Sequence, residues 1–112
     1  MKDEMTGEFI QVTTAIDTRE NAHKIAEEVV QKRLAACVHV HGPITSTYWW
    51  QGTREVAEEW VCTAKTRKDL FDKLMETIRS LHPYEEPEII ALPISAGSRS
   101  YLDWIAQETI PS

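Results

Sequence analysis

Two runs of alternating side chains, joined by a short turn, constrain this chain most. Residues 38–51 and 56–66 place successive side chains on opposite faces, as strands do, and Gly52 to Arg54 form the turn between them. Together they predict a long β-hairpin. Gly42-Pro43 interrupts the alternation of the first strand. Because proline has no backbone N–H to donate, we expect a bulge there.

The segments on either side of the hairpin predict two more strands and three helices. β-branched and aromatic residues predict a first strand at 9–14. An apolar run between two prolines predicts a last strand at 87–93 that is buried on both faces. Apolar residues at helical spacing predict helices from Asp17 or Thr18 to about residue 34, from 67 to 81, and from 101 onward.

The resulting order, β-α-β-β-α-β with a C-terminal helix, predicts an α+β fold of the ferredoxin-like split-βαβ type. Its antiparallel sheet would carry two helices on one face only. The other face would expose Trp and Val side chains to water, so we expect other subunits to cover it. We expect a single domain at 9–110 that follows a flexible N-terminus at 1–8.

Charge and hydropathy exclude several classes of partner. The formal net charge of −6 argues against nucleic acid, because binding there depends on basic patches that neutralise phosphates. No apolar run reaches the length of about 18 residues that a membrane helix needs, and the N-terminus lacks the apolar core of a signal peptide. We therefore expect a cytoplasmic protein. There, Cys37 and Cys62 would be buried thiols rather than a disulfide.

The stretch from His82 to Glu88 concentrates the most chemistry: an imidazole, a phenol, three carboxylates and two prolines. The prolines restrict the backbone, so this loop should be stiff. His82 either ligates a metal or caps the last carbonyls of the preceding helix. Lys65, at a strand end, is expected to pair with Tyr84 or Glu88, in either a functional or a structural role.

Other residues admit both a functional and a structural interpretation. Trp50 and Trp104 either line a cleft between subunits, together with Tyr84, or belong to the core or an interface. Cys37 follows two alanines and is either a packed thiol or a ligand. His39 and His41 share a strand face, where they either bind a common metal or are simply solvated.

Evidence for catalysis is slight. The acidic pairs Glu27-Glu28 and Glu58-Glu59 lie on a helix surface and across a strand, so neither converges on one point. The sequence contains no Ser/His/Asp triad motif, phosphate loop or dinucleotide fingerprint. We expect a binding protein and not an enzyme.

Several motifs, in order and at matching spacing, resemble the family of the divalent-cation-tolerance protein CutA. The similarity covers roughly residues 11–108. The motifs that carry it are RLAACV at 33–38, ITSTYWWQG at 44–52, KTR at 65–67, HPYE at 82–85 with Pro87-Glu88, ALP at 91–93, and Gly97 with YLDW at 101–104. The resemblance implies a homotrimer related in architecture to the PII signalling proteins, with strands of neighbouring subunits joined edge to edge.

The resemblance also implies tolerance to divalent cations and binding of copper or another divalent metal. Copper ligation in the family involves a first-strand cysteine and adjacent histidines before the HPYE proline. This chain has Thr13 and Leu81 at two of those positions, which leaves His82. The resulting expectation is a trimer that binds divalent metal or a small molecule in clefts between subunits, lined by Lys65, Tyr84, Glu88, Trp50, Cys37 and Trp104. The alternatives are a PII-like signalling or scaffold module, and, less favoured, an enzyme that uses Lys65, Tyr84 and Glu88.

Overall fold

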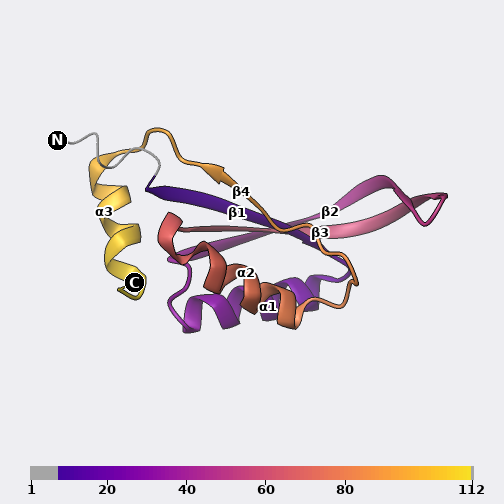
Figure 1. The fold of residues 1–112 in the computed structure, drawn as a ribbon, viewed down its shortest axis with the longest axis horizontal. Coiled ribbons are helices and arrows are strands. Elements are labelled where there is room, and N and C mark those ends of the chain that lie inside the picture. Colours follow the sequence, from indigo (N-terminus) through magenta and orange to yellow (C-terminus); the bar gives the residue numbers. More distant parts are fainter. Residues whose placement is uncertain (1–7, 112) are drawn as a thin grey trace.

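One four-stranded antiparallel sheet organises the chain (Figure 1). The computed structural model describes residues 8–111. The strands are β1 (Phe9–Ile16), β2 (Cys37–Trp50), β3 (Thr53–Arg67) and β4 (Ile90–Pro93), in the spatial order β2-β3-β1-β4. The helices are α1 (Arg19–Gln31), α2 (Phe71–Leu81) after a short 3₁₀ turn (Lys68–Leu70), and α3 (Arg99–Glu108). This arrangement confirms the predicted ferredoxin-like α+β fold.

The β2–β3 hairpin is longer than the rest of the sheet. β1 pairs with β3 only as far as Ile16 and Trp60, so residues 53–59 of β3 continue beyond β1 with β2 as their sole partner among residues 8–111. The hairpin consequently projects from the body of the molecule (Figure 1). The whole molecule, hairpin included, measures 50 × 25 × 22 Å. Its turn lies at Gln51-Gly52, where both residues have positive φ angles.

The predicted bulge lies where the projection begins. The β2–β3 register shifts between His41 and Ile44, around a cis Gly42–Pro43 bond. A Cβ at Gly42 would lie 2.8 Å from the ring of Trp60, so only glycine lets the indole pack against the backbone there.

α1 and α2 cover one face of the sheet and form the core with it (Figure 1). Thr18, and not Asp17, caps α1, since its side chain accepts the Asn21 N–H at 3.0 Å. Leu34 packs in the core but lies after the helix, which ends before Arg33 with its φ of 58°. Of the tryptophans expected on the open face, Trp50 lies there by strand alternation, whereas Trp60 packs on the core side.

The prediction that the last strand is buried on both faces is wrong for the single chain. β4 is shorter than predicted, pairs with β1 alone among residues 8–111, and is exposed along its whole length. Ile90 and Leu92 are 50% and 55% exposed. The apolar run therefore marks an edge strand with an open face, not a central one.

Glu8 is the one residue of the expected N-terminal segment that the structure describes. Residues 1–7 of the expected flexible N-terminus lie outside the described residues, while the Glu8 carbonyl accepts a hydrogen bond from the Lys68 N–H at 2.7 Å. None of the helices within residues 8–111 has the length and apolar character needed to span a bilayer.

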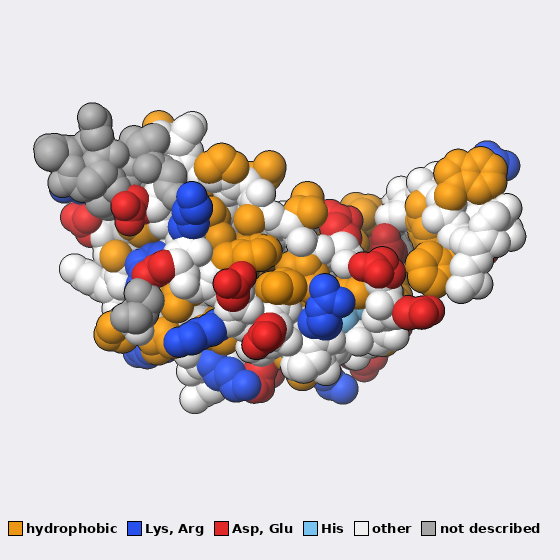
Figure 2. Space-filling model, in the orientation of Figure 1, with side chains coloured by type: hydrophobic (Ala, Val, Ile, Leu, Met, Phe, Trp, Pro, Cys, Tyr) orange, Lys and Arg blue, Asp and Glu red, His pale blue; other side chains and the backbone are white. Residues whose placement is uncertain are grey.

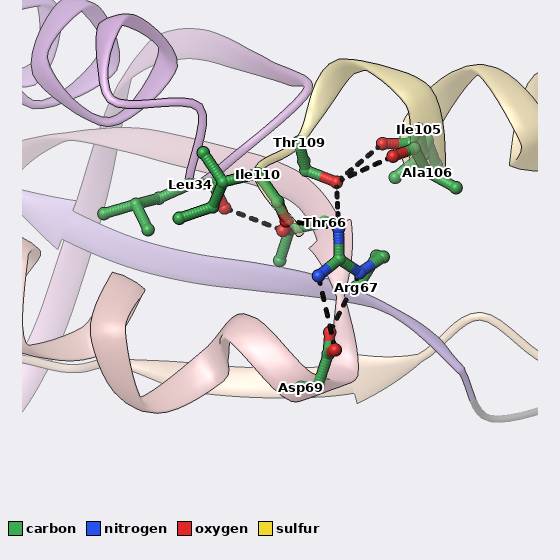
Figure 3. Close-up of polar contacts among 8 residues, drawn as sticks. All are labelled: Leu34, Thr66, Arg67, Asp69, Ile105, Ala106, Thr109 and Ile110. Carbon is green, nitrogen blue, oxygen red and sulfur yellow. Dashed lines mark hydrogen bonds and ion pairs between the residues drawn. The ribbon is translucent and has the colours of Figure 1, made fainter. Parts of the chain in front are cut away.

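Arg67 fastens the C-terminal segment to the end of β3 (Figure 3). Its Nη1 donates to the Thr109 hydroxyl at 2.8 Å and to the Ile110 carbonyl at 2.6 Å, and its Nε and Nη2 donate to the two oxygens of the Asp69 carboxylate. α3 itself packs Leu102 and Ile105 against Phe9 at this end of the sheet. One side chain thus joins β3, the 3₁₀ turn and the residues that follow α3.

Replacing this arginine should loosen the C-terminal end. We expect Arg67→Ala to lower the free energy of unfolding by about 2 kcal/mol, because buried acceptors lose charge-assisted hydrogen bonds. Chemical denaturation at fixed protein concentration measures the change. Lys68→Ala, at the exposed neighbouring position, is the control and should change stability by less than about 0.5 kcal/mol. Equal effects of the two substitutions would contradict the role assigned to Arg67.

Candidate ligand cleft

An acidic cleft of about 780 Å³ lies between the projecting hairpin and the loop of residues 82–88. It is lined by Ala15, Ser46, Thr47, Tyr48, Trp49, Trp50, Glu59, Tyr84, Glu85, Glu86 and Glu88. No basic side chain is among these described lining residues. Figure 2 shows Asp and Glu side chains grouped where the hairpin leaves the body of the molecule.

Strand alternation places four lining residues on one face of the hairpin. Glu59 is the register partner of Ile44, and residues at steps of two along β2 point the same way. Ser46, Tyr48 and Trp50 therefore share the face of Glu59. Two aromatic side chains and a carboxylate form one wall of the cleft, and the 82–88 loop forms the other.

Glu59 is a carboxylate that is only 6% exposed, and it is held by a phenol. The Tyr84 hydroxyl donates to Glu59 Oε2 at 2.7 Å. Burial raises the pKa of Tyr84 well above its usual range, and the hydrogen bond and charge of Glu59 raise it further. Tyr84 is therefore a neutral hydrogen-bond donor near pH 7 and not a base.

His82 uses both ring nitrogens within the fold. Nε2 lies 2.9 Å from the Ala15 carbonyl, and Nδ1 accepts the Tyr84 N–H at 3.2 Å. This pattern requires the neutral tautomer with the proton on Nε2. Neither ring nitrogen keeps a free lone pair for a metal in this arrangement. His82 is the C-cap residue of α2, but its backbone N–H, and not its ring, donates to the Arg79 carbonyl at 3.3 Å. The side chain instead ties the loop to the end of β1.

The structure brings together three of the predicted cleft residues and separates the others. Trp50, Tyr84 and Glu88 line the acidic cleft. Lys65 does not pair with Tyr84 or Glu88, because it lies six residues from Glu59 along β3, a distance of roughly 20 Å. Its register partners are Gln11 and Cys37.

Cys37 lies at the opposite end of the sheet, close to α3, and α3 itself carries Trp104. Cys37 Sγ is 3.6 Å from the Tyr101 hydroxyl, and the Tyr101 ring stacks on Trp104 at 5.5 Å. The contact with Cys37, together with burial, raises the pKa of Tyr101 to about 12. The site predicted as one cleft is thus two separate groups within a single chain.

Both cysteines are free thiols, as predicted. The buried Cys62 thiol donates to the Ala22 carbonyl at 3.4 Å, and burial raises its pKa to about 11. Such a thiol is a packed core group rather than a nucleophile or metal ligand.

The two strand histidines form no complete metal site. His39 and His41 are exposed on the sheet face opposite the helices, with Thr63 and Val61 as their β3 partners. Within residues 8–111, no group of three or more His, Cys, Asp or Glu side chains is placed to hold a metal ion. A site at these histidines would need ligands from another chain.

Glu59 and Tyr48 are cleft residues that sequence reasoning missed. The alternation of Glu58 and Glu59 across the strand was predicted correctly, and Glu58 is exposed. The inward position of Glu59 depends on the phenol of Tyr84, which lies 25 residues away in sequence. No local sequence pattern predicts that contact. The one signal in the sequence is that Glu59 shares a strand face with Val61 and Thr63, which indicates that this carboxylate lies toward the sheet surface and not along the edge.

Comparisons with known proteins agree on one family. A family model described as "CutA1 divalent ion tolerance protein" matches residues 10–108. "Divalent-cation tolerance protein CutA" of Thermus thermophilus is 44% identical over 98 residues, covering 88% of this chain and 95% of that protein. Human "Protein CutA" is 47% identical over 88 residues, covering 79% of this chain. The chain spans about half of the human protein and of its rice chloroplast relative, at 49% and 56%.

Solved structures give the same result. The structure of a divalent cation tolerance protein from T. thermophilus has a TM-score of 0.88 at 42% identity, covering 90% of this chain and 98% of its own. CutA1 from Oryza sativa has a TM-score of 0.92 at 36% identity, with coverage of 96% and 99%.

The His82 arrangement makes stability depend on pH. Burial lowers the pKa of His82 below 6.5, against the opposing effects of the Ala15 carbonyl, Asp17 and Glu59. Below about pH 6.5 the unfolded chain therefore binds a proton that the folded chain resists, so stability should fall as the pH decreases. A proton on Nδ1 would also point at the Tyr84 N–H, so two hydrogen-bond donors would face each other and that hydrogen bond would be lost.

Denaturation between about pH 7.5 and 5 tests this. We expect His82→Gln to flatten the loss of stability in this range, while His23→Gln, at an exposed position on α1, keeps the wild-type slope. A wild-type slope in the His82 variant would show that another group causes the pH dependence.

Proposed function

The chain belongs to the CutA1 divalent ion tolerance family, and we propose that it acts as a homotrimer that binds a divalent cation in the acidic cleft. The observation that carries the proposal is the cleft itself: Glu59, Glu85, Glu86 and Glu88 line one cavity without a basic residue among its described lining. Such a cavity attracts cations.

Unpaired strand edges support the assembly. β2 and β4 are the two edge strands, and the 53–59 segment of β3 has no partner on the β1 side among residues 8–111. Open edges of this kind pair with other chains unless they are covered. The exposed Ile90 and Leu92 of β4 add apolar area that association would bury. The number three comes from the resemblance to the family.

Oxygen ligands fit the cleft better than imidazole does. Carboxylates suit Mg²⁺, Ca²⁺ or Mn²⁺, whereas Cu²⁺ favours imidazole among its ligands. His82 is engaged by the backbone, so copper would require carboxylates or His39 and His41 of more than one subunit. Because no three such side chains of one chain converge within residues 8–111, waters or a second subunit would complete the coordination.

A role as a PII-like scaffold is the second candidate. One observation favours it: the projecting hairpin exposes Trp49 at 73% and Val56 at 63%, on one face of the ribbon. Large exposed apolar side chains mark protein contacts. An enzyme built on Lys65, Tyr84 and Glu88 is disfavoured, because Lys65 lies far from the other two.

The trimer is tested by mass. Light scattering of the purified protein should give about three times the chain mass of 12.8 kDa. We expect Leu92→Glu to shift the population to smaller species, because it places a charge in the buried contact. Lys73→Glu, at an exposed position on α2, should leave the mass unchanged. A wild-type mass of a single chain would refute the trimer.

Metal binding is tested by calorimetry on the assembled protein. Mn²⁺ and Cu²⁺ should bind more tightly than about millimolar, and the double variant Glu86→Gln/Glu88→Gln should weaken binding about tenfold or more. His82→Gln should have little effect, since its ring nitrogens are already used. Glu58→Gln, exposed on the other face of the hairpin, removes a carboxylate outside the cleft and is the control. Binding that survives loss of the cleft carboxylates would refute this site.

A further inference from the structure

We propose that the acidic cleft also binds an aliphatic diamine or polyamine, an organic cation whose charges are spaced along an apolar chain. The inference rests on the proposed role of the cleft as a cation site, but not on its binding a metal. It follows from three features of the cleft: how its charges are spread, what its walls are made of, and how Glu59 is held.

The carboxylates are distributed along the cleft. Glu59 comes from β3, whereas Glu85, Glu86 and Glu88 come from the loop on the opposite side. The described residues do not bring three of these groups around one point. A single small ion can approach only part of this charge at once. A cation with two or more separated ammonium groups can approach carboxylates on both walls.

Aromatic side chains complete the match. Tyr48 and Trp50 share the hairpin face that carries Glu59, and both line the cleft. A hydrated metal ion gains little from indole and phenol rings. An alkylammonium ion is attracted to their faces, and its methylene chain packs against them. The volume of about 780 Å³ also suits a small organic molecule, for which pockets measure roughly 300–1,000 Å³.

Glu59 is prepared to receive a cation. The side chain is almost fully buried, yet its only hydrogen bond among the described residues comes from Tyr84, to Oε2. The second oxygen, Oε1, has no donor within residues 8–111, and no Lys or Arg neutralises the group there. Among residues 8–111, only Thr14 Oγ1 is a buried side-chain polar atom without a partner, so Glu59 Oε1 is reached by solvent in the cleft. An ammonium group that donates to Oε1 would give this carboxylate a cationic partner and leave the Tyr84 bond in place.

Calorimetric titration of the assembled, metal-free protein with putrescine and spermidine tests the proposal. Binding should be tighter than that of n-butylamine by tenfold or more at equal ionic strength, because a monoamine supplies only one charge. Both Glu59→Gln and Trp50→Leu should weaken putrescine binding at least fivefold. Glu59→Gln keeps the acceptor for Tyr84, and Glu88→Gln provides a second carboxylate variant at an exposed position. Glu58→Gln should bind like the wild type.

The outcomes separate this inference from the metal proposal. Equal affinity for putrescine and n-butylamine, or unchanged putrescine binding in the Glu59, Glu88 and Trp50 variants, would overturn it even if Mn²⁺ or Cu²⁺ binds. Diamine binding that depends on these residues would support it even if neither metal binds. Competition between Mn²⁺ and putrescine for the wild-type protein would place both ligands in the same cleft.

Discussion

The unequal lengths of β1 and β3 determine most of this structure. β1 ends opposite Trp60, and β3 begins seven residues earlier at Thr53, so the hairpin must leave the sheet with only its own two strands to support it. The bulge at Gly42-Pro43 and the indole of Trp60 lie at that point, where β3 loses its pairing with β1 and the hairpin extends beyond the rest of the sheet. Shortening the hairpin would remove one wall of the cleft.

Each end of the sheet is fastened by polar side chains that span several elements. At the α3 end, Arg67 joins β3 to the C-terminal segment through charge-assisted hydrogen bonds. At the hairpin end, His82 joins the 82–88 loop to β1, and Tyr84 joins it to β3. The prolines stiffen the loop, but these two contacts determine where it lies. The contacts of His82 and Tyr84 therefore position the backbone that carries the three exposed carboxylates, Glu85, Glu86 and Glu88.

Periodicity was sufficient to predict the order of elements, the hairpin and its bulge, because these depend on local patterns. It failed where tertiary contacts decide the outcome. The apolar run at 89–92 suggested a central strand, yet the sheet order makes β4 an edge. His82 is a candidate ligand by sequence, but both of its ring nitrogens contact backbone groups. One is the Ala15 carbonyl, which is distant in sequence, and the other is the Tyr84 N–H, two residues further along the loop. The alternation of Glu58 and Glu59 argues against a paired acid site, but it does not reveal the contact of Glu59 with Tyr84, which lies in another segment.

The proposed assembly and the proposed cation binding would be linked through the same strand segment. Residues 53–59 of β3 carry Glu59 and also present an unpaired edge beyond the end of β1. A strand from another subunit that paired with this edge would run beside the acidic cleft and lower its exposure to water. Reduced solvent access strengthens the attraction between the carboxylates and a bound cation. It also raises the free-energy cost of leaving the carboxylates without a cation. Cation binding should therefore favour the assembled state, and assembly should in turn tighten cation binding, by the same free energy.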